Sequence, residues 1–187
     1  MAYYSSEELQ CLGFKKVGSN VKVSDKASLY NLNDIEIGDN SRIDDFCVIS
    51  GKIKIGKNVH IAPFCLVAGG ELGITLEDFS GLAYGVKVFS QSDDYSGGTL
   101  TNPTVPAEYK KEKKSAVYIG KHVIIGAGSM VFPGVKVADG CSVGAMTVVN
   151  KDTAEWGIYL GNPARRIKER KKDLLELELQ YINTHQV

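Results

Sequence analysis

The chain has 187 residues, 43% of them hydrophobic, which is enough for one domain with a buried core. Its 22 basic and 22 acidic residues cancel, so the net charge indicates neither nucleic acid nor a membrane surface as a partner. No apolar run is long enough to span a bilayer, and the start, MAYYSSEELQ, lacks the basic and apolar pattern of a signal peptide. We therefore expect a single cytoplasmic domain, residues 1–187, without membrane insertion.

An N-terminal segment, residues 1–20, precedes the regular part of the chain. Residues 5–12 are predicted to form one helix, because either of the serines at positions 5 and 6 is a suitable N-terminal cap. Glycine and asparagine residues then mark turns that lead into the next region.

An aliphatic residue recurs at every sixth position over most of residues 21–162. Such a period fits neither an α-helix nor a simple strand alternation, and it is typical of repeat architectures. All fifteen positions are Ile, Leu or Val, whereas about half would be polar in an ordinary soluble composition. The positions are Ile37, Ile43, Ile49, Ile55, Ile61, Val67, Leu76, Leu82, Val88, Ile119, Ile125, Val131, Val137, Val143 and Val149.

The fifth residue of most six-residue units is small or β-branched, and it lies two residues before the next aliphatic position. In an extended segment both point to the same face, which predicts short flat strands around a narrow triangular core. Turn residues such as Gly38, Asp39 and Asn40 separate the strands. Three cysteines occupy the fifth place, so we expect buried thiols and neither disulfides nor a metal site. They are Cys47, Cys65 and Cys141.

Two long segments depart from the repeat. Residues 89–118 interrupt it for thirty residues, which is too long for an idle connector, and their prolines and tyrosines predict an ordered arm. After the turn Gly161-Asn162-Pro163, residues 163–187 change to a basic sequence that continues into LLELELQYI. We predict a C-terminal helix there, over residues 164–182.

The repeat, together with the segment LGNPAR (160–165) after its last unit, resembles the hexapeptide-repeat acyltransferases over residues 20–170. The resemblance implies a left-handed parallel β-helix, a hand opposite to that of ordinary parallel crossovers. It also implies a homotrimer, with acetyl-CoA as co-substrate in the cleft between neighbouring prisms. Within the family, SQSDDYSG (90–97) and TNPTVPAEY (101–109) are similar to enzymes of O-antigen synthesis that acetylate dTDP-4-amino-4,6-dideoxyglucose.

By motif position, the resemblance implies that residues of the last units line the acetyl-CoA cleft and that basic residues beyond them reach its phosphates. Alternatively, the small residues serve only as turn residues, and the basic ones form a solvated helix face. The residues concerned are Ala127, Gly128, Ala145 and Asn150 at the cleft, with Arg165 and Lys168 at the phosphates.

In related O-acetyltransferases, a histidine at the start of the long loop acts as general base, a task that suits imidazole near neutral pH. The matching place in this sequence is Asp93, followed by Asp94. A carboxylate is a poor base for a hydroxyl group, but it can orient a sugar amine and receive its proton. We therefore favour N-acetylation of a dTDP-linked amino-deoxy sugar, with O-acetylation as the alternative. Both aspartates could instead cap turns of their own loop.

His60 ends the unit IGKNVH, at a corner close to where the family binds its acceptor. We expect it to face Asp93 across the trimer interface, as a base or as a hydrogen-bond partner of the substrate. A plain corner histidine is the other interpretation, and for His122 we expect a surface position. The candidates for contact with the acceptor are Asp94, Tyr95 and Glu71, the last in a short insertion at residues 69–75.

Two other classes of protein are compatible with the same fold. A carbonic anhydrase of the γ type would need three histidines around a zinc ion, and only His60 and His122 lie within the repeat. A non-catalytic scaffold is the second class, because the loop histidine of the family is absent. Binding of acetyl-CoA separates the scaffold from a transferase.

Overall fold

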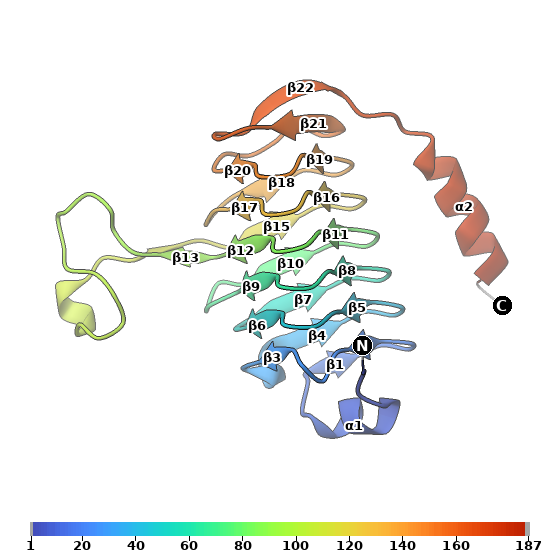
Figure 1. The fold of residues 1–187 in the computed structure, drawn as a ribbon, viewed down its shortest axis with the longest axis horizontal. Helices are drawn as coiled ribbons and strands as arrows, with labels where there is room; N and C mark the ends of the chain where they lie inside the picture. The colour runs from blue at the N-terminus through green and yellow to red at the C-terminus, as the bar shows by residue number, and fades with distance from the viewer. Residues whose placement is uncertain (1, 186–187) are drawn as a thin grey trace.

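The protein is a parallel β-helix with an arm on one side and a helix on the other, in a computed structural model that describes residues 2–185 (Figure 1). Met1 and residues 186–187, which the predicted domain includes, lie outside this range. Short strands form three parallel sheets along the prism, and each full turn of the coil adds one strand to each sheet. The predicted fold class, a β-helix with a long loop and a C-terminal helix, is confirmed.

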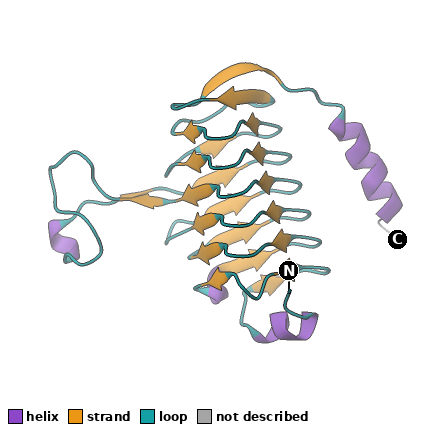
Figure 2. Ribbon diagram, viewed as in Figure 1, coloured by secondary structure: helices purple, strands orange, loops and turns teal. Residues whose placement is uncertain are grey.

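The three sheets are stacked ladders of short strands (Figure 2). Sheet 1 contains β1 (Lys16–Val17), β4 (Ile35–Ile37), β7 (Ile53–Ile55), β10 (Ile74–Leu76), β15 (Val117–Ile119) and β18 (Lys136–Val137). Sheet 2 contains β2 (Lys22–Val23), β5 (Arg42–Ile43), β8 (His60–Ile61), β11 (Gly81–Leu82), β16 (Ile124–Ile125), β19 (Ser142–Val143), β21 (Gly157–Leu160) and β22 (Arg165–Glu169). Sheet 3 contains β3 (Ser28–Leu29), β6 (Val48–Ser50), β9 (Leu66–Ala68), β12 (Lys87–Phe89), β17 (Met130–Val131) and β20 (Val148–Val149).

The interior of the prism is the continuous hydrophobic core that the six-residue period predicts. All fifteen periodic residues have at most 2% of their surface exposed. The three cysteines at the fifth place are buried and free, as predicted. Each thiol donates a hydrogen bond to a backbone carbonyl farther along the coil, so it ties successive turns together in addition to filling space. The acceptors are the carbonyls of Ala62, Ala83 and Ala154, each at 3.1 Å from the respective sulfur.

Backbone conformation explains the polar and glycine residues at the corners. Asn40 and Asn58 adopt positive φ angles of 59° and 54°, which asparagine tolerates better than most residues. At Gly38 the neighbouring turn approaches so closely that a Cβ atom would lie 2.6 Å from the carbonyl carbon of Gly56. The corners therefore require small residues for stacking and asparagine for the change of direction.

The predicted N-terminal helix is confirmed as α1 (Ser6–Cys11), which closes the lower end of the prism. Ser5 is its cap: the hydroxyl accepts from the N–H of Glu8 at 3.2 Å, and the Glu8 carboxylate accepts from the N–H of Ser5 at 2.7 Å. This reciprocal arrangement satisfies two backbone donors at once. A 3₁₀ turn, η1 (Leu32–Asp34), follows β3.

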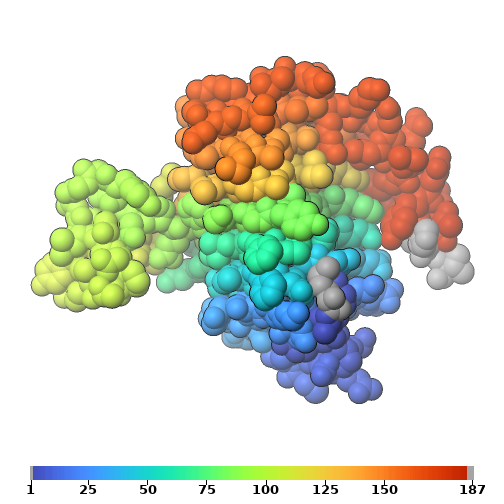
Figure 3. All heavy atoms as spheres, viewed as in Figure 1, coloured from blue at the N-terminus to red at the C-terminus, as the bar shows by residue number. Residues whose placement is uncertain are grey.

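The arm, residues 90–116, leaves the prism between β12 and β15 and stands clear of it in the space-filling view (Figure 3). Its base is an antiparallel ribbon of β13 (Gln91–Ser92) and β14 (Lys113–Lys114), and its outer part contains the 3₁₀ turn η2 (Ala107–Tyr109). The predicted ordered arm is therefore present.

The predicted C-terminal helix over 164–182 is wrong in its first part. Arg165–Glu169 form β22, which pairs antiparallel with β21, and the helix α2 spans only Leu174–His185. β21 is the last parallel strand of sheet 2, so one of its edges would otherwise present unpaired N–H and C=O groups. Pairing of β22 satisfies that edge, and this tertiary demand outweighs the helical preference of a sequence rich in Arg and Lys.

Candidate active site

The turns that join sheet 2 to sheet 3 form one continuous corner of the prism, which we call the 2–3 corner (residues 24–27, 44–47, 62–65, 83–86, 126–129 and 144–147). Ala127 and Gly128 lie in one turn, and Ala145 lies in the next. The N–H of Met146 donates to the carbonyl of Ala127 at 2.8 Å, which stacks the two turns. A Cβ atom at Gly128 would lie 2.5 Å from the Met146 sulfur, so only glycine leaves room there.

The other residues predicted at acetyl-CoA lie elsewhere on the upper part of the prism. Asn150 is exposed just after β20, at the corner between sheets 3 and 1. Arg165 and Lys168 are exposed on β22, opposite Leu160 and Ile158 of β21. The structure thus brings Ala127, Gly128 and Ala145 together and places the basic pair at the end of the coil beyond them.

Asp93 lies at the base of the arm, directly after β13, and lines two open cavities. One cavity, of about 580 Å³, extends over the arm and also touches Tyr95, Lys111 and Phe132. The other, of about 410 Å³, lies against the prism beside Ser50 and Gly70 among others. The carboxylate accepts one backbone hydrogen bond, from the N–H of Asn102 at 3.3 Å. Asp93 is therefore available to a ligand that enters from either side of the arm.

The carboxylate of Asp94 is engaged within its own loop. It accepts from the N–H of Ser96 at 2.9 Å and from the Ser96 hydroxyl at 2.8 Å, and Thr99 donates to it at 3.3 Å. The hydrogen bonds from Ser96 hold the pKa of Asp94 below its usual value. This is the turn-capping geometry that the sequence left open for the two aspartates, and it applies more fully to Asp94.

The two remaining acceptor candidates are peripheral in the single chain. Glu71 is exposed and forms an ion pair with Lys114 of β14, at 3.4 Å, so it lies beside the base of the arm. Tyr95 is 90% exposed on the arm.

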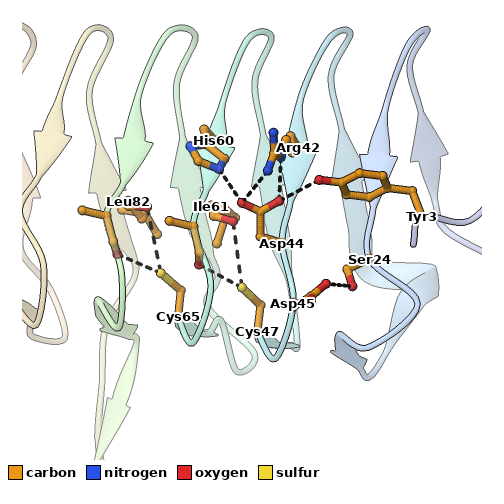
Figure 4. Close-up of polar contacts among 12 residues, drawn as sticks. Tyr3, Ser24, Arg42, Asp44, Asp45, Cys47, His60, Ile61, Cys65 and Leu82 are labelled. Carbon is orange, nitrogen blue, oxygen red and sulfur yellow. Dashed lines mark hydrogen bonds and ion pairs between the residues drawn. The ribbon is translucent and has the colours of Figure 1, made fainter. Parts of the chain in front are cut away.

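His60 lies on the outward face of sheet 2, and its Nε2 is 2.8 Å from Oδ2 of Asp44 (Figure 4). The Asp44 side chain is only 2% exposed. It accepts from Nε and Nη2 of Arg42 at 2.6 and 3.1 Å, and from the hydroxyl of Tyr3 at 3.1 Å. Burial raises the pKa of Asp44, but the hydrogen bonds from Arg42 and His60 outweigh it and hold that pKa below its usual value.

His60 and Asp93 do not line a common cavity within the part of the chain that the structure describes. His60 lines a groove of about 510 Å³ between sheet 2 and α2, together with Gly81, Ile124 and Leu177 among others. The arm and α2 lie on opposite sides of the prism (Figure 1). A site that uses both residues would therefore need two copies of the chain.

His122 is not the surface residue that the sequence predicted. It is 8% exposed, its ring stacks on Phe79 with centroids 5.3 Å apart, and its Nε2 lies 2.8 Å from Oε2 of Glu178 on α2. The prediction failed because the repeat places His122 at an outward corner but gives no information on what covers that corner.

Sequence reasoning also missed Tyr3, Arg42 and Asp44. One signal was present for Asp44. Six strands of sheet 2 have an aliphatic core residue, and the residue after it is small in five of them, namely Ser24, Ala62, Ala83, Gly126 and Gly144. Asp44 is the charged exception, and its carboxylate is the common hydrogen-bond partner of Tyr3, Arg42 and His60.

Within residues 2–185, no group of three or more His, Cys, Asp and Glu side chains could hold a metal ion. No helix in that range is long and apolar enough to cross a membrane.

Comparison with known proteins identifies the family. The family model described as bacterial transferase hexapeptide (six repeats) matches residues 34–69. The chain is 45% identical over 181 residues to the dTDP-4-amino-4,6-dideoxy-D-glucose acyltransferase of Escherichia coli, which covers 95% of this chain and 94% of that protein.

Solved structures agree over the whole coil. AntD, an N-acyltransferase from Bacillus cereus in complex with dTDP and 3-hydroxybutyryl-CoA, matches with a TM-score of 0.97 and 46% identity, over 99% of this chain and 98% of that one. A serine-to-alanine variant of AntD in complex with dTDP-4-amino-4,6-dideoxyglucose and coenzyme A matches with a TM-score of 0.97 and 47% identity, over 98% of both chains. This chain therefore belongs to the hexapeptide-repeat acyltransferases.

Proposed function

We propose that the protein transfers an acetyl group from acetyl-CoA to the amino group of a dTDP-linked amino-deoxy sugar. The observation that carries the proposal is the 45% identity to the Escherichia coli acyltransferase, because it extends over 95% of the chain and includes the arm. Asp93, at the place where O-acetylating relatives have a histidine, supports an amine as the acceptor. The reaction would take place in the cytoplasm, in the synthesis of a surface polysaccharide such as O-antigen.

The chemistry consists of one bond formed and one bond broken at the thioester carbonyl carbon. The neutral amine of the sugar attacks this carbon and forms the C–N bond of a tetrahedral intermediate. The C–S bond then breaks as the intermediate collapses, and the coenzyme A thiolate leaves and takes up a proton. One proton leaves the former amine nitrogen for a base, so the products are an amide and a free thiol.

The candidate residues have distinct roles in this reaction. Asp93 accepts a hydrogen bond from the amine and orients its lone pair towards the thioester, and His60 receives the proton. Asp94, Tyr95 and Glu71 surround the sugar nucleotide at the base of the arm. The residues along coenzyme A are Ala127, Gly128, Ala145 and Asn150, with Arg165 and Lys168 near its phosphates.

The proposed assembly is a homotrimer. An exposed apolar stripe on the 2–3 corner supports it: Phe46 and Phe64 stack with centroids 5.3 Å apart and are 53% and 62% exposed. Tyr84 and Met146 extend the stripe with exposures of 65% and 75%. Apolar side chains exposed in such a line are typical of a protein interface. A second copy would also allow His60 of one chain to meet Asp93 of another.

The test is the release of coenzyme A thiol with a panel of acceptors and donors. The acceptors are dTDP-4-amino-4,6-dideoxyglucose, the same nucleotide sugar with a hydroxyl group at C4, and the free amino sugar. The donors are acetyl-CoA and 3-hydroxybutyryl-CoA. We expect thiol release with the nucleotide-linked amine and acetyl-CoA, and a trimer by sedimentation equilibrium.

Three outcomes would overturn parts of the proposal. Faster transfer to the C4 hydroxyl would make the protein an O-acyltransferase. Preference for 3-hydroxybutyryl-CoA would replace acetyl as the transferred group. No transfer, together with no thermal stabilisation by millimolar acetyl-CoA, would favour a scaffold without catalytic activity.

A further inference from the structure

We infer that Asp44 is a positioning residue for the transfer reaction: it orients His60 and fixes the tautomer in which Nδ1 of His60 accepts the proton of the attacking amine. The inference rests on the proposed function for the reaction itself. Its structural part, the orientation of the imidazole, rests only on the contacts of Asp44.

The surroundings of Asp44 are those of a carboxylate that is kept ionised and rigid. A carboxylate that is 98% buried is costly unless donors surround it. Here four donor atoms from three residues converge on it: Nε and Nη2 of Arg42, Nε2 of His60 and the Tyr3 hydroxyl. The same carboxylate occupies a place where five of the six equivalent turns have Gly, Ala or Ser. The coil does not need a charge there, which favours a role in function.

The state of Asp44 determines which nitrogen of His60 carries the proton. The pKa of Asp44 is held below its usual value, so near neutral pH this side chain is a carboxylate and can only accept hydrogen bonds. Nε2 of His60, 2.8 Å from Oδ2, must therefore be the donor. In the neutral imidazole this leaves Nδ1 as the acceptor, on a side chain that is 51% exposed.

The other charged groups around the groove are engaged with different partners. Arg170 donates to the carbonyls of His122 and Gly140 at 2.6 and 3.0 Å. Glu178 forms ion pairs with Lys121 and His122 at 2.5 and 2.8 Å. Within the described residues, Asp44 is the carboxylate in contact with His60. Arg42 is the cross-strand neighbour of His60 in the β5–β8 pair, and both Arg42 and Tyr3 donate to the same carboxylate.

The substitution Asp44→Asn tests this arrangement with little change of shape. Nε of Arg42 and the Tyr3 hydroxyl both donate to Oδ1 at 2.6 and 3.1 Å, and Nη2 of Arg42, at 3.1 Å, competes with His60 for Oδ2. The amide oxygen is therefore expected to take the Oδ1 place, and the bond from Nη2 is lost. The amide NH₂ would then point at Nε2 of His60 and convert this atom to an acceptor, which moves the proton to Nδ1. A protonated Nδ1 cannot accept a proton from the amine in the neutral imidazole.

We expect Asp44→Asn to lower kcat for transfer to the nucleotide-linked amine by about 10- to 100-fold, with KM for both substrates nearly unchanged. Nitrogen-15 NMR of the imidazole, assigned through His60→Gln, is expected to show the Nε2–H tautomer in the wild type and the Nδ1–H tautomer in the variant. The matched control is Asp45→Asn. Asp45 is the next residue and accepts from the Ser24 hydroxyl at 2.5 Å, so its substitution should change neither quantity.

A double-mutant cycle makes the test independent of the stability of one variant. If Asp44 acts through His60, then Asp44→Asn combined with His60→Gln should have the kcat of His60→Gln alone, within about twofold. A double variant in which the kcat losses of the two single variants multiply would overturn the inference. An unchanged kcat in Asp44→Asn would overturn it as well. Should Asp44→Asn fail to fold, an Nδ1–H tautomer in the wild type would overturn it equally. A wild type that transfers no acyl group contradicts the proposed function instead, and the tautomer then still decides whether Asp44 orients His60.

Discussion

Two histidine–carboxylate pairs lie on the same side of the prism and have the same geometry. In each pair Nε2 of the histidine is 2.8 Å from a carboxylate oxygen: His60 from Asp44, and His122 from Glu178. Both carboxylates are buried, with side chains 2% and 9% exposed, and hydrogen bonds hold both pKa values below the usual range against the effect of burial. The imidazoles differ, since His60 is 51% exposed and His122 only 8%.

The difference in access comes from α2. This helix supplies Glu178 and covers His122, whose ring is also stacked on Phe79 and lies 6.5 Å from the ring of Trp156. Within residues 2–185 no such cover lies over His60, which faces a groove. One pair therefore fastens a helix to the coil, and the other can meet a substrate. The comparison teaches that the pair itself does not determine the role; the structure around the imidazole does.

The largest effect is expected from His60→Gln. Loss of the proton acceptor should lower kcat by about 100-fold, while the melting temperature stays within about 2 °C because the side chain is half exposed. Steady-state kinetics and thermal unfolding measure the two quantities. His122→Gln is the matched control and should keep kcat. Equal loss of activity in both variants would contradict the division of roles.

Glu178→Gln tests the structural pair. The substitution removes the charge that Lys121 and His122 share, while a side chain of similar shape remains. We expect the free energy of unfolding to fall by about 1–3 kcal/mol, because Lys121 loses its counter-charge and the buried ring of His122 loses its carboxylate partner. Urea unfolding measures this loss, and kcat of the folded variant should equal that of the wild type. A loss of kcat without a loss of stability would assign Glu178 to the reaction.

The pH dependence of stability is a second test of the pair formed by Glu178 and His122. Burial raises the pKa of Glu178, but hydrogen bonds from Lys121 and His122 lower it by more, so the folded pKa lies below the unfolded value of about 4.3. The ionised pair therefore contributes stability in full above about pH 5, and this contribution is lost as the pH falls through the folded pKa. The difference in unfolding free energy between wild type and Glu178→Gln should shrink below about pH 4. A difference that stays constant down to pH 3 would show that the charge of Glu178 is not responsible.

The smallest effect is expected from Tyr181→Phe. Tyr181 packs edge-on against Phe79, with centroids 5.9 Å apart, and its hydroxyl donates to Oδ1 of Asn58 at 3.0 Å. The variant keeps the ring contact and loses this hydrogen bond, so the free energy of unfolding should fall by about 0.5–1.5 kcal/mol. Hydrogen exchange of the α2 amides is expected to increase. Unchanged exchange would show that the Tyr181–Asn58 hydrogen bond does not hold the helix.

The interior of the coil could be predicted because it depends on local rules. The aliphatic residues from Ile37 to Val149 face inward wherever the six-residue period places them, and Cys47, Cys65 and Cys141 follow the same rule. The cap at Ser5 is local as well, since it needs only Glu8 three residues later. Each of these features is determined within one or two units of the repeat.

The features that were missed depend on what packs on the outside of the coil. β22 pairs with β21 because an edge needs a partner, and this condition is invisible in the residues Arg165–Glu169 themselves. The burial of His122 depends on α2, which is 56 residues away at Glu178. Asp44 was visible in the sequence as a charged residue where most equivalent turns of sheet 2 have a small one. Its contact with His60 could not be predicted, because it depends on how successive turns stack. For Asp93 and the residues predicted along coenzyme A, the sequence supplied positions, and the roles remain predictions.

The short strand β22 also limits how far the coil can extend. A stack of parallel strands has an open end on which another copy could add its own strands, as in amyloid fibrils. Here the chain turns back and covers the last edge of sheet 2 with a strand whose residues are all exposed and which carries Arg165, Arg166 and Lys168. Arg166 is paired with Glu169 of the same strand at 2.6 Å, whereas the positive charges of Arg165 and Lys168 along this edge repel an identical edge. The residues proposed to meet the phosphates of coenzyme A thus also act as a terminator that keeps one molecule from polymerising onto the next.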